Sequence, residues 1–122
     1  MNTAFIMLGS NDQTKINIEL AIHKLAEHVE IISRSSQIKT EPYGGSYSAD
    51  FQNMALKIVS AGTRDETIAL FKQIEVEMGR KPDSKRNGII PIDIDLIFWN
   101  DELVHDDYRR CEYVRKSIKE IK

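Results

Sequence analysis

Apolar residues in the first third of the chain predict a strand, a helix and a second strand. Thr3 to Leu8 is a short apolar run, which is typical of a buried strand. From Lys15 to His28 the apolar residues recur at helical spacing, and Asn11 or Asp12 is expected to cap this helix. The alternation from Val29 to Thr40 predicts one long strand.

The same patterns continue beyond a Gly- and Pro-containing loop. Phe51 to Ser60 predicts a strand, and Thr63-Arg64-Asp65-Glu66 has the form of a capping box that begins a second helix. Gly79 is expected to end that helix in a left-handed conformation. Ile92 to Phe98 reads as another strand. The end of the chain is predicted to hold a turn, a short extended segment and a helix, at Trp99–Glu102, Leu103–Val104 and Tyr113–Ile121.

The order of these elements predicts the fold class. A β-α-β-β-α-β order followed by a C-terminal helix is the order of the ferredoxin-like, split βαβ arrangement. We therefore expect an α+β fold, with an antiparallel sheet and the helices on one face. The length of 122 residues fits one domain, and no linker interrupts residues 1–122.

Composition and charge exclude several function classes. Hydrophobic residues make up 41% and charged residues 30% of the chain, which is ordinary for a globular protein. A net charge of -2 argues against a nucleic-acid binder, and no apolar stretch is long enough for a membrane span. Cys111 is the single cysteine and the N-terminus has no secretory pattern, so we expect a cytoplasmic protein.

Two aspartates in the strand near residue 95 are the first candidates for chemistry. Side chains alternate along a strand, so Asp93 and Asp95 share one face, and Ile92, Ile94, Leu96 and Phe98 share the other. Paired carboxylates in a buried strand need a positive partner, and a divalent cation such as Mg²⁺ takes such oxygen ligands. Solvent-facing aspartates on an open strand are the alternative interpretation.

A basic loop leads into this strand. It contains four cations, Arg80, Lys81, Lys85 and Arg86. Phosphoryl transfer uses a metal site beside such cations, although a solvated loop is the simpler interpretation. Glu75, on the helix before the loop, is expected either to contact a nucleotide or to face solvent. Gly9-Ser10-Asn11 is a short segment that offers backbone N–H groups of the kind that bind phosphate.

Taken in order along the chain, these motifs resemble one enzyme family. They are Gly9-Ser10-Asn11, Thr40-Glu41-Pro42-Tyr43, Phe51-Gln52-Asn53, Ile74-Glu75 with Gly79-Arg80, and Ile92-Asp93-Ile94-Asp95-Leu96. The resemblance is to 6-hydroxymethyl-7,8-dihydropterin pyrophosphokinase, which transfers diphosphate from ATP to a pterin alcohol in folate biosynthesis and releases AMP. The family has a ferredoxin-like core, in agreement with the predicted fold.

The resemblance implies a role for each matching residue. Asp93 and Asp95 would hold two Mg²⁺ ions, and Arg80 would act with them in catalysis. The pterin would be bound by Thr40, Tyr43, Phe51, Asn53 and Tyr113. The nucleotide would be contacted by Glu75, Arg80, Lys85, Arg86 and His105. The expected partners are therefore small molecules, pterin and ATP, and the chain is expected to be a monomer or a weak homodimer.

Some positions depart from the family pattern. Ile90 stands where the family carries a second Arg, and His105 lacks a preceding Pro. The tail is short, with residues 106–110 in place of a longer nucleotide-contacting segment. These departures leave a second interpretation, a catalytically weakened relative that binds pterin or nucleotide. A third, a ferredoxin-like RNA-binding module, is disfavoured by the net charge and by the lack of exposed aromatic residues in the third strand.

Overall fold

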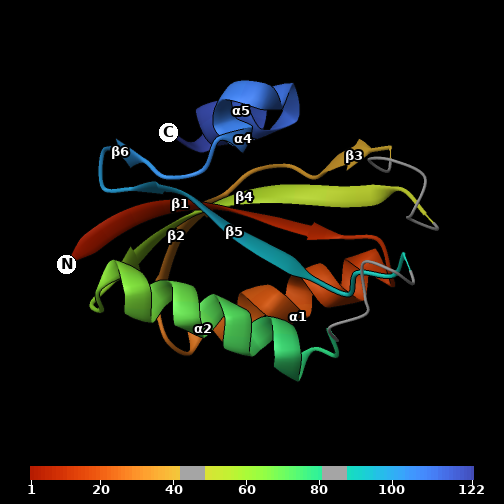
Figure 1. Cartoon of the computed structure of the whole chain (residues 1–122), viewed down its shortest axis with the longest axis horizontal. Coiled ribbons are helices and arrows are strands. Elements are labelled where there is room, and N and C mark those ends of the chain that lie inside the picture. Colours follow the sequence, from red (N-terminus) through yellow and green to blue (C-terminus); the bar gives the residue numbers. More distant parts are fainter. Residues whose placement is uncertain (42–48, 81–87) are drawn as a thin grey trace.

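The computed structural model describes residues 1–41, 49–80 and 88–122, and its helices lie on both sides of one sheet (Figure 1). In chain order, the elements are β1 (Asn2–Ser10), α1 (Thr14–Ala26), β2 (Glu30–Arg34), β3 (Ile38–Thr40), β4 (Phe51–Ser60), α2 (Arg64–Glu77), β5 (Asp93–Trp99), β6 (Glu102–Leu103), α4 (Asp107–Arg110) and α5 (Glu112–Ile121). No helix in these described ranges is long and apolar enough to cross a membrane.

The sheet has the strand order β2-β4-β1-β5-β6, and β3 also pairs with β4. Every pairing is antiparallel. Because β4 lies between β1 and β2, it separates two parallel strands that α1 connects, which is the split βαβ arrangement. The predicted ferredoxin-like α+β fold is therefore confirmed.

The prediction that the helices cover one face is wrong. In Figure 1, α1 and α2 lie below the sheet, whereas α4 and α5 lie above it. Two apolar clusters result, one around Ile6, Leu56 and Phe71 and one around Met7 and Val114. β1 contributes to both clusters, so residues Ala4 to Met7 are all buried, and this is why the strand reads as a continuous apolar run.

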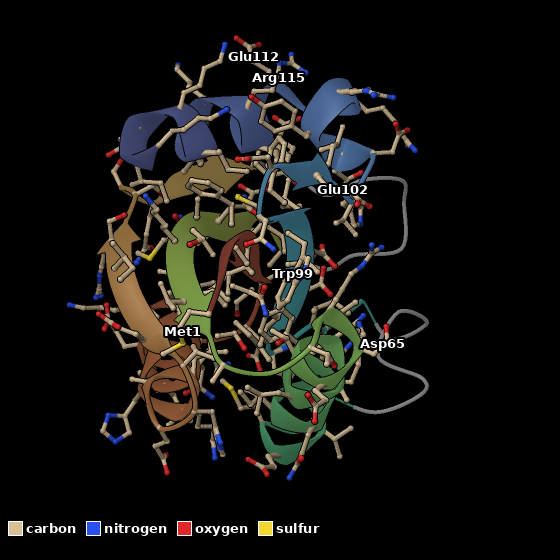
Figure 2. All side chains as sticks on the ribbon, turned by 90° about the vertical axis from the view of Figure 1, so that its left-hand side faces the viewer. Met1, Asp65, Trp99, Glu102, Glu112 and Arg115 are labelled. Carbon is tan, nitrogen blue, oxygen red and sulfur yellow. The ribbon has the colours of Figure 1, made fainter. Side chains whose placement is uncertain are left out.

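The second face is closed by α5, the helix predicted from Tyr113 to Ile121. Figure 2 shows Glu112 and Arg115 on the side of this helix that points away from the sheet. Arg115 donates hydrogen bonds to the backbone carbonyls of Tyr108 and Arg109, at 3.1 and 2.6 Å. These bonds fix α4 against α5. The short helix α4 has no apolar period of its own, and the sequence pattern did not predict it.

The predicted strand from Val29 to Thr40 is two strands. β2 and β3 both pair with β4, but residues 35–37 separate them. Ser35 donates its backbone N–H to the carbonyl of Ala55, and its hydroxyl accepts the N–H of Ala55 at 2.8 Å. The serine side chain thus takes the place of a carbonyl in the ladder, and the backbone can bend there without losing a buried hydrogen bond.

Two further local predictions are corrected. α1 is preceded by Gln13 at φ 40°, and no side chain caps it, so the prediction that Asn11 or Asp12 caps α1 is wrong. The pairing register between β1 and β5 also shifts: Phe5 pairs with Phe98, whereas the next residue, Ile6, pairs with Leu96. Such a bulge inserts one residue, so Phe98 packs into the cluster around Met7 and Val114 instead of lying with Leu96.

Other predicted features of these helices and turns are confirmed. The side chain of Thr63 accepts the N–H of Glu66 at 3.1 Å, and the Glu66 carboxylate accepts the N–H of Thr63 at 2.8 Å. These reciprocal bonds hold the pKa of Glu66 below its ordinary value. Gly79 follows α2 at φ 96°, where glycine is favoured over residues with a side chain. The turn between β5 and β6 contains Asn100 at φ 54°.

Candidate functional site

The polar residues of the candidate site meet at one end of the sheet because of the strand register. Gly9, near the end of β1, pairs with Asn53 on β4 and with Asp93 on β5. Ile38 on β3 pairs with Asn53 from the other side. A Cβ on Gly9 would lie 3.3 Å from the Asn53 side-chain oxygen. A side chain at this position would crowd the Asn53 amide, so glycine keeps the space beside that amide open.

A small cavity of about 140 Å³ lies at this end, between the sheet and the start of α5. The structure brings together six of the predicted site residues in its wall: Thr40, Phe51, Asn53, Asp93, Asp95 and Tyr113. Glu41 and Asp107, which were not predicted, also line it. Tyr43 lies outside the described residues.

Asn53 has its two amide protons engaged in the sheet edge. Its Nδ2 donates to the carbonyl of Ile38 at 3.0 Å and to the hydroxyl of Thr40 at 2.9 Å. The side chain is 5% exposed, so its orientation is fixed. What remains toward Gly9 is the carbonyl oxygen Oδ1, which is an acceptor. This arrangement suits a ligand that donates N–H groups.

Asp93 and Asp95 both line the small cavity, as their predicted common face requires. Burial raises the pKa of Asp95 to about 8, and the charge of Asp93 and a hydrogen bond with it add to the rise. Asp93 has its own cation, because Arg80 Nη1 lies 2.7 Å from its Oδ1. The pair is therefore a set of adjacent carboxyl oxygens with one cation beside it, and it fits a hard divalent cation.

Glu75 supports this arrangement from α2. Its Oε2 accepts the N–H of Ile94, between the two aspartates, at 2.8 Å, and its Oε1 lies 3.4 Å from Arg80 Nη1. Burial raises the pKa of Glu75, although the N–H of Ile94 opposes the rise. Glu75 is 4% exposed, so the expectation that it faces solvent is wrong. It lies behind Arg80 and lines neither of the cavities described here.

A large cavity of about 330 Å³ adjoins the small one. Its described wall contains Lys72, Arg80, Ile90 and His105. It shares four residues with the small cavity: Phe51, Asp93, Asp95 and Asp107. The carboxylates therefore stand where the two cavities meet. Lys85 and Arg86, predicted to face a nucleotide, lie outside the described residues.

Asp107 is the main acidic residue that the sequence pattern missed. Donor atoms of Asp95, His105 and Asp107 lie within 4.8 Å of one another. His105 Nδ1 accepts the backbone N–H of Asp107 at 3.1 Å. Asp107 begins the four-residue helix α4, which is too short for periodicity to reveal. Its position beside Asp106 was the only sequence signal.

The Gly9-Ser10-Asn11 segment has a structural role that differs from the predicted phosphate contact. Asn11 is 8% exposed, and its amide donates to the carbonyl of Gly88 at 2.7 Å and accepts the N–H of Ile90 at 2.6 Å. Its own N–H donates to the carbonyl of Ile90 at 3.1 Å. Asn11 thus holds the chain that leads into β5 and its aspartates.

Comparison with known proteins gives matches over almost the whole chain. A family model described as 7,8-dihydro-6-hydroxymethylpterin-pyrophosphokinase matches residues 5–122. The Aquifex aeolicus 2-amino-4-hydroxy-6-hydroxymethyldihydropteridine pyrophosphokinase is 34% identical over 105 residues, which are 85% of this chain and 65% of the relative. The Bacillus subtilis protein of the same name is 33% identical over 87% of this chain and 65% of its own length. The chain thus spans slightly less than two thirds of these two curated relatives.

A third relative is matched over more of its length, and solved structures support the fold. The Haemophilus influenzae protein of that name is 26% identical over 99% of this chain and 82% of its own length. A solved structure titled as HPPK-DHPS in complex with substrates has a TM-score of 0.61 at 16% identity, over 81% of this chain and 28% of that one. A Plasmodium falciparum HPPK-DHPS structure has a TM-score of 0.51 at 13% identity, over 98% of this chain and 33% of that one.

Proposed function

The chain belongs to the 7,8-dihydro-6-hydroxymethylpterin-pyrophosphokinase family, and we propose that it transfers diphosphate from ATP to 6-hydroxymethyl-7,8-dihydropterin. One observation carries the proposal: Asp93 and Asp95 line both cavities. A reaction that joins two substrates needs its charged groups at the point where their sites meet. We take residues 1–122 to act as one domain in this reaction.

The small cavity is the proposed pterin site. Asn53 would accept a hydrogen bond from the amino and ring N–H groups of the pterin, since its Oδ1 is the atom left toward the cavity. Phe51 and Tyr113 would contact the faces of the planar ring, as aromatic side chains do. Thr40 fixes Asn53 through its hydroxyl, at 2.9 Å.

The large cavity is the proposed site of the ATP phosphates. Arg80 and His105 line it, and both would contact phosphate oxygens. Asp93 and Asp95 would hold two Mg²⁺ ions, because carboxylate oxygens are the ligands that Mg²⁺ takes in proteins. When bound, the ions supply positive charge to the phosphate oxygens during transfer.

The proposed reaction uses this placement of the two sites. The hydroxymethyl oxygen of the pterin attacks the β-phosphorus of ATP and forms the new O–P bond. The bond from the β-phosphorus to the oxygen of the α-phosphate breaks, AMP leaves, and the proton of the hydroxyl is released. Arg80 stabilises charge on the transferred group, and Asn53 and the aromatic residues orient the pterin for in-line attack.

The test is AMP release, measured by chromatography after incubation with ATP, Mg²⁺ and 6-hydroxymethyl-7,8-dihydropterin. The Asp93→Ala/Asp95→Ala variant should release no pterin-dependent AMP. Asp101→Ala, which removes a carboxylate from the exposed β5–β6 turn, should match the wild type. If the wild type releases no AMP at high protein concentration, the transferase is refuted and calorimetry with pterin and with ATP would test a binding module.

A further inference from the structure

Lys72 lines the large cavity, and the proposed reaction assigns it no role. Lys72 and Arg80 are the lysine and arginine in the described part of its wall. They reach it from different places, Lys72 from the third turn of α2 and Arg80 from just beyond the end of that helix. Ile90, which also lines this cavity and is 2% exposed, brings no charge to it.

Arg80 is already bound into the protein. Its Nη1 lies 2.7 Å from Asp93 Oδ1, 3.4 Å from Glu75 Oε1 and 3.5 Å from the carbonyl of Ile92. The side chain is 19% exposed. Asp93 and Glu75 therefore neutralise much of the positive charge of Arg80. A phosphate group in the cavity would compete with these carboxylates for the guanidinium.

Lys72 is in the opposite situation. Its side chain is 60% exposed, and within the described residues its ammonium contacts one acidic group, Glu75 Oε1, at 3.4 Å. An ammonium has three donors, so it keeps hydrogen-bonding capacity toward the cavity. The flexible stem of a lysine also allows the charge to follow an incoming anion without a change in the helix.

The helix itself sets the position of both cations. Lys72 and Glu75 are three residues apart, which places them on one face of α2. After Gly79 the chain turns back, and the N–H of Arg80 donates to the carbonyl of Glu75 at 3.0 Å. One buried carboxylate thus lies beside both cations and holds them at the same side of the large cavity.

We propose that Lys72 binds the polyphosphate of the nucleotide and is the cation that meets it from α2. The ligand carries several negative charges, and Asp93, Asp95 and Asp107 also line this cavity, so additional positive charge in its wall favours binding. Lys72 has the exposure and the donors to supply it, and Arg80 completes the contact from the wall. This inference rests on the proposed function, since it places the ATP phosphates in the large cavity.

The experiment compares three variants with the wild type by calorimetry. Lys72→Gln removes the charge, Lys72→Arg keeps it, and Lys24→Gln is the matched control. Lys24 lies on α1 and makes an ion pair with Glu77 of α2 at 3.3 Å, and it lines neither cavity. The ligands are MgATP, Mg-tripolyphosphate, adenosine and 6-hydroxymethyl-7,8-dihydropterin. All variants are first compared by thermal unfolding.

Lys72→Gln should weaken binding of MgATP and of Mg-tripolyphosphate by about ten- to one-hundred-fold, the usual effect of removing a charge-assisted hydrogen bond. Adenosine and pterin affinities should not change, because neither ligand carries phosphate. Lys72→Arg should bind within about threefold of the wild type, since it keeps the charge, and Lys24→Gln should bind like the wild type. Equal loss for adenosine or pterin would mean that the substitution disturbs the whole site, and would overturn the proposal.

The same data separate this inference from the proposed function. If AMP is released but Lys72→Gln binds MgATP as tightly as the wild type, the role of Lys72 is refuted and the transferase stands. If no AMP is released but Lys72→Gln selectively loses polyphosphate affinity, the binding role stands and the transferase is refuted. Failure of the wild type to bind Mg-tripolyphosphate or MgATP would overturn the binding role directly.

Discussion

Asp95→Asn is expected to make the metal-free protein more stable. Burial, with help from the charge of Asp93 and the hydrogen bond between the two, raises the pKa of Asp95 from an ordinary value of 3.8 to about 8. In the unfolded chain the carboxyl loses its proton near the ordinary value. Between these two pH values, folding must therefore take up a proton.

The sign and the upper limit follow from linkage. Because the folded-state pKa is raised, the stability from the neutral carboxyl is complete below about pH 4 and is lost as the pH rises toward 8. The difference between 3.8 and about 8 corresponds to roughly 5 to 6 kcal/mol, at about 1.36 kcal/mol per pH unit. Asn resembles the neutral carboxyl and cannot ionise. Asp95 lines a cavity, and the charge of Lys72 opposes the rise in its pKa, so we expect a gain below this limit, about 1–3 kcal/mol near pH 8.

The assay is urea denaturation with EDTA at about pH 5 and about pH 8, for the wild type, Asp95→Asn and Asp101→Asn. The gain of Asp95→Asn should be largest at the higher pH, and Asp101→Asn, in the exposed turn, should lie within about 0.5 kcal/mol of the wild type. Adding Mg²⁺ should stabilise the wild type and not Asp95→Asn. Lower stability of Asp95→Asn at the higher pH would show that the carboxylate is a structural partner, and would refute the reasoning.

Three further substitutions test the supports of the site. Asn11→Ala should lower the free energy of unfolding, measured in urea, by about 2–4 kcal/mol, because the carbonyl of Gly88 and the N–H of Ile90 lose their Asn11 partner. A loss below about 1 kcal/mol would contradict the structural role of Asn11. Glu75→Ala should cost about 1–3 kcal/mol, since it leaves the N–H of Ile94 unpaired, whereas Glu77→Ala on the exposed side of α2 should cost about 0.5 kcal/mol or less. Asn53→Ala should weaken pterin binding in calorimetry by about tenfold or more and leave ATP binding unchanged; equal pterin affinity would remove Asn53 from the site.

The sequence by itself determined the elements with strong periods and the residues of the carboxylate pair. Alternation in β5 placed Asp93 and Asp95 on one face, and both line the same cavities. The capping box at Thr63 and the glycine at the end of α2 were readable because they depend on a few neighbouring residues. The order of elements was sufficient for the ferredoxin-like arrangement, since few topologies accommodate it.

Only the tertiary structure decided which residues support that pair. Burial of Glu75 depends on the open edge of β5, where the N–H of Ile94 needs an acceptor from another element. Asn11 and Ile90 are 79 residues apart in sequence, so no local pattern relates them.

The position of α4 and α5 on the second face of the sheet was also decided only by tertiary contacts. α5 packs on the sheet face opposite α1 and α2, and it carries Tyr113 to the small cavity. The bulge near Phe98 and the helix that brings Asp107 to the carboxylates likewise depend on contacts between distant segments. Periodicity reports which side of an element is apolar, whereas the choice of partner for that side is made by packing over the whole chain.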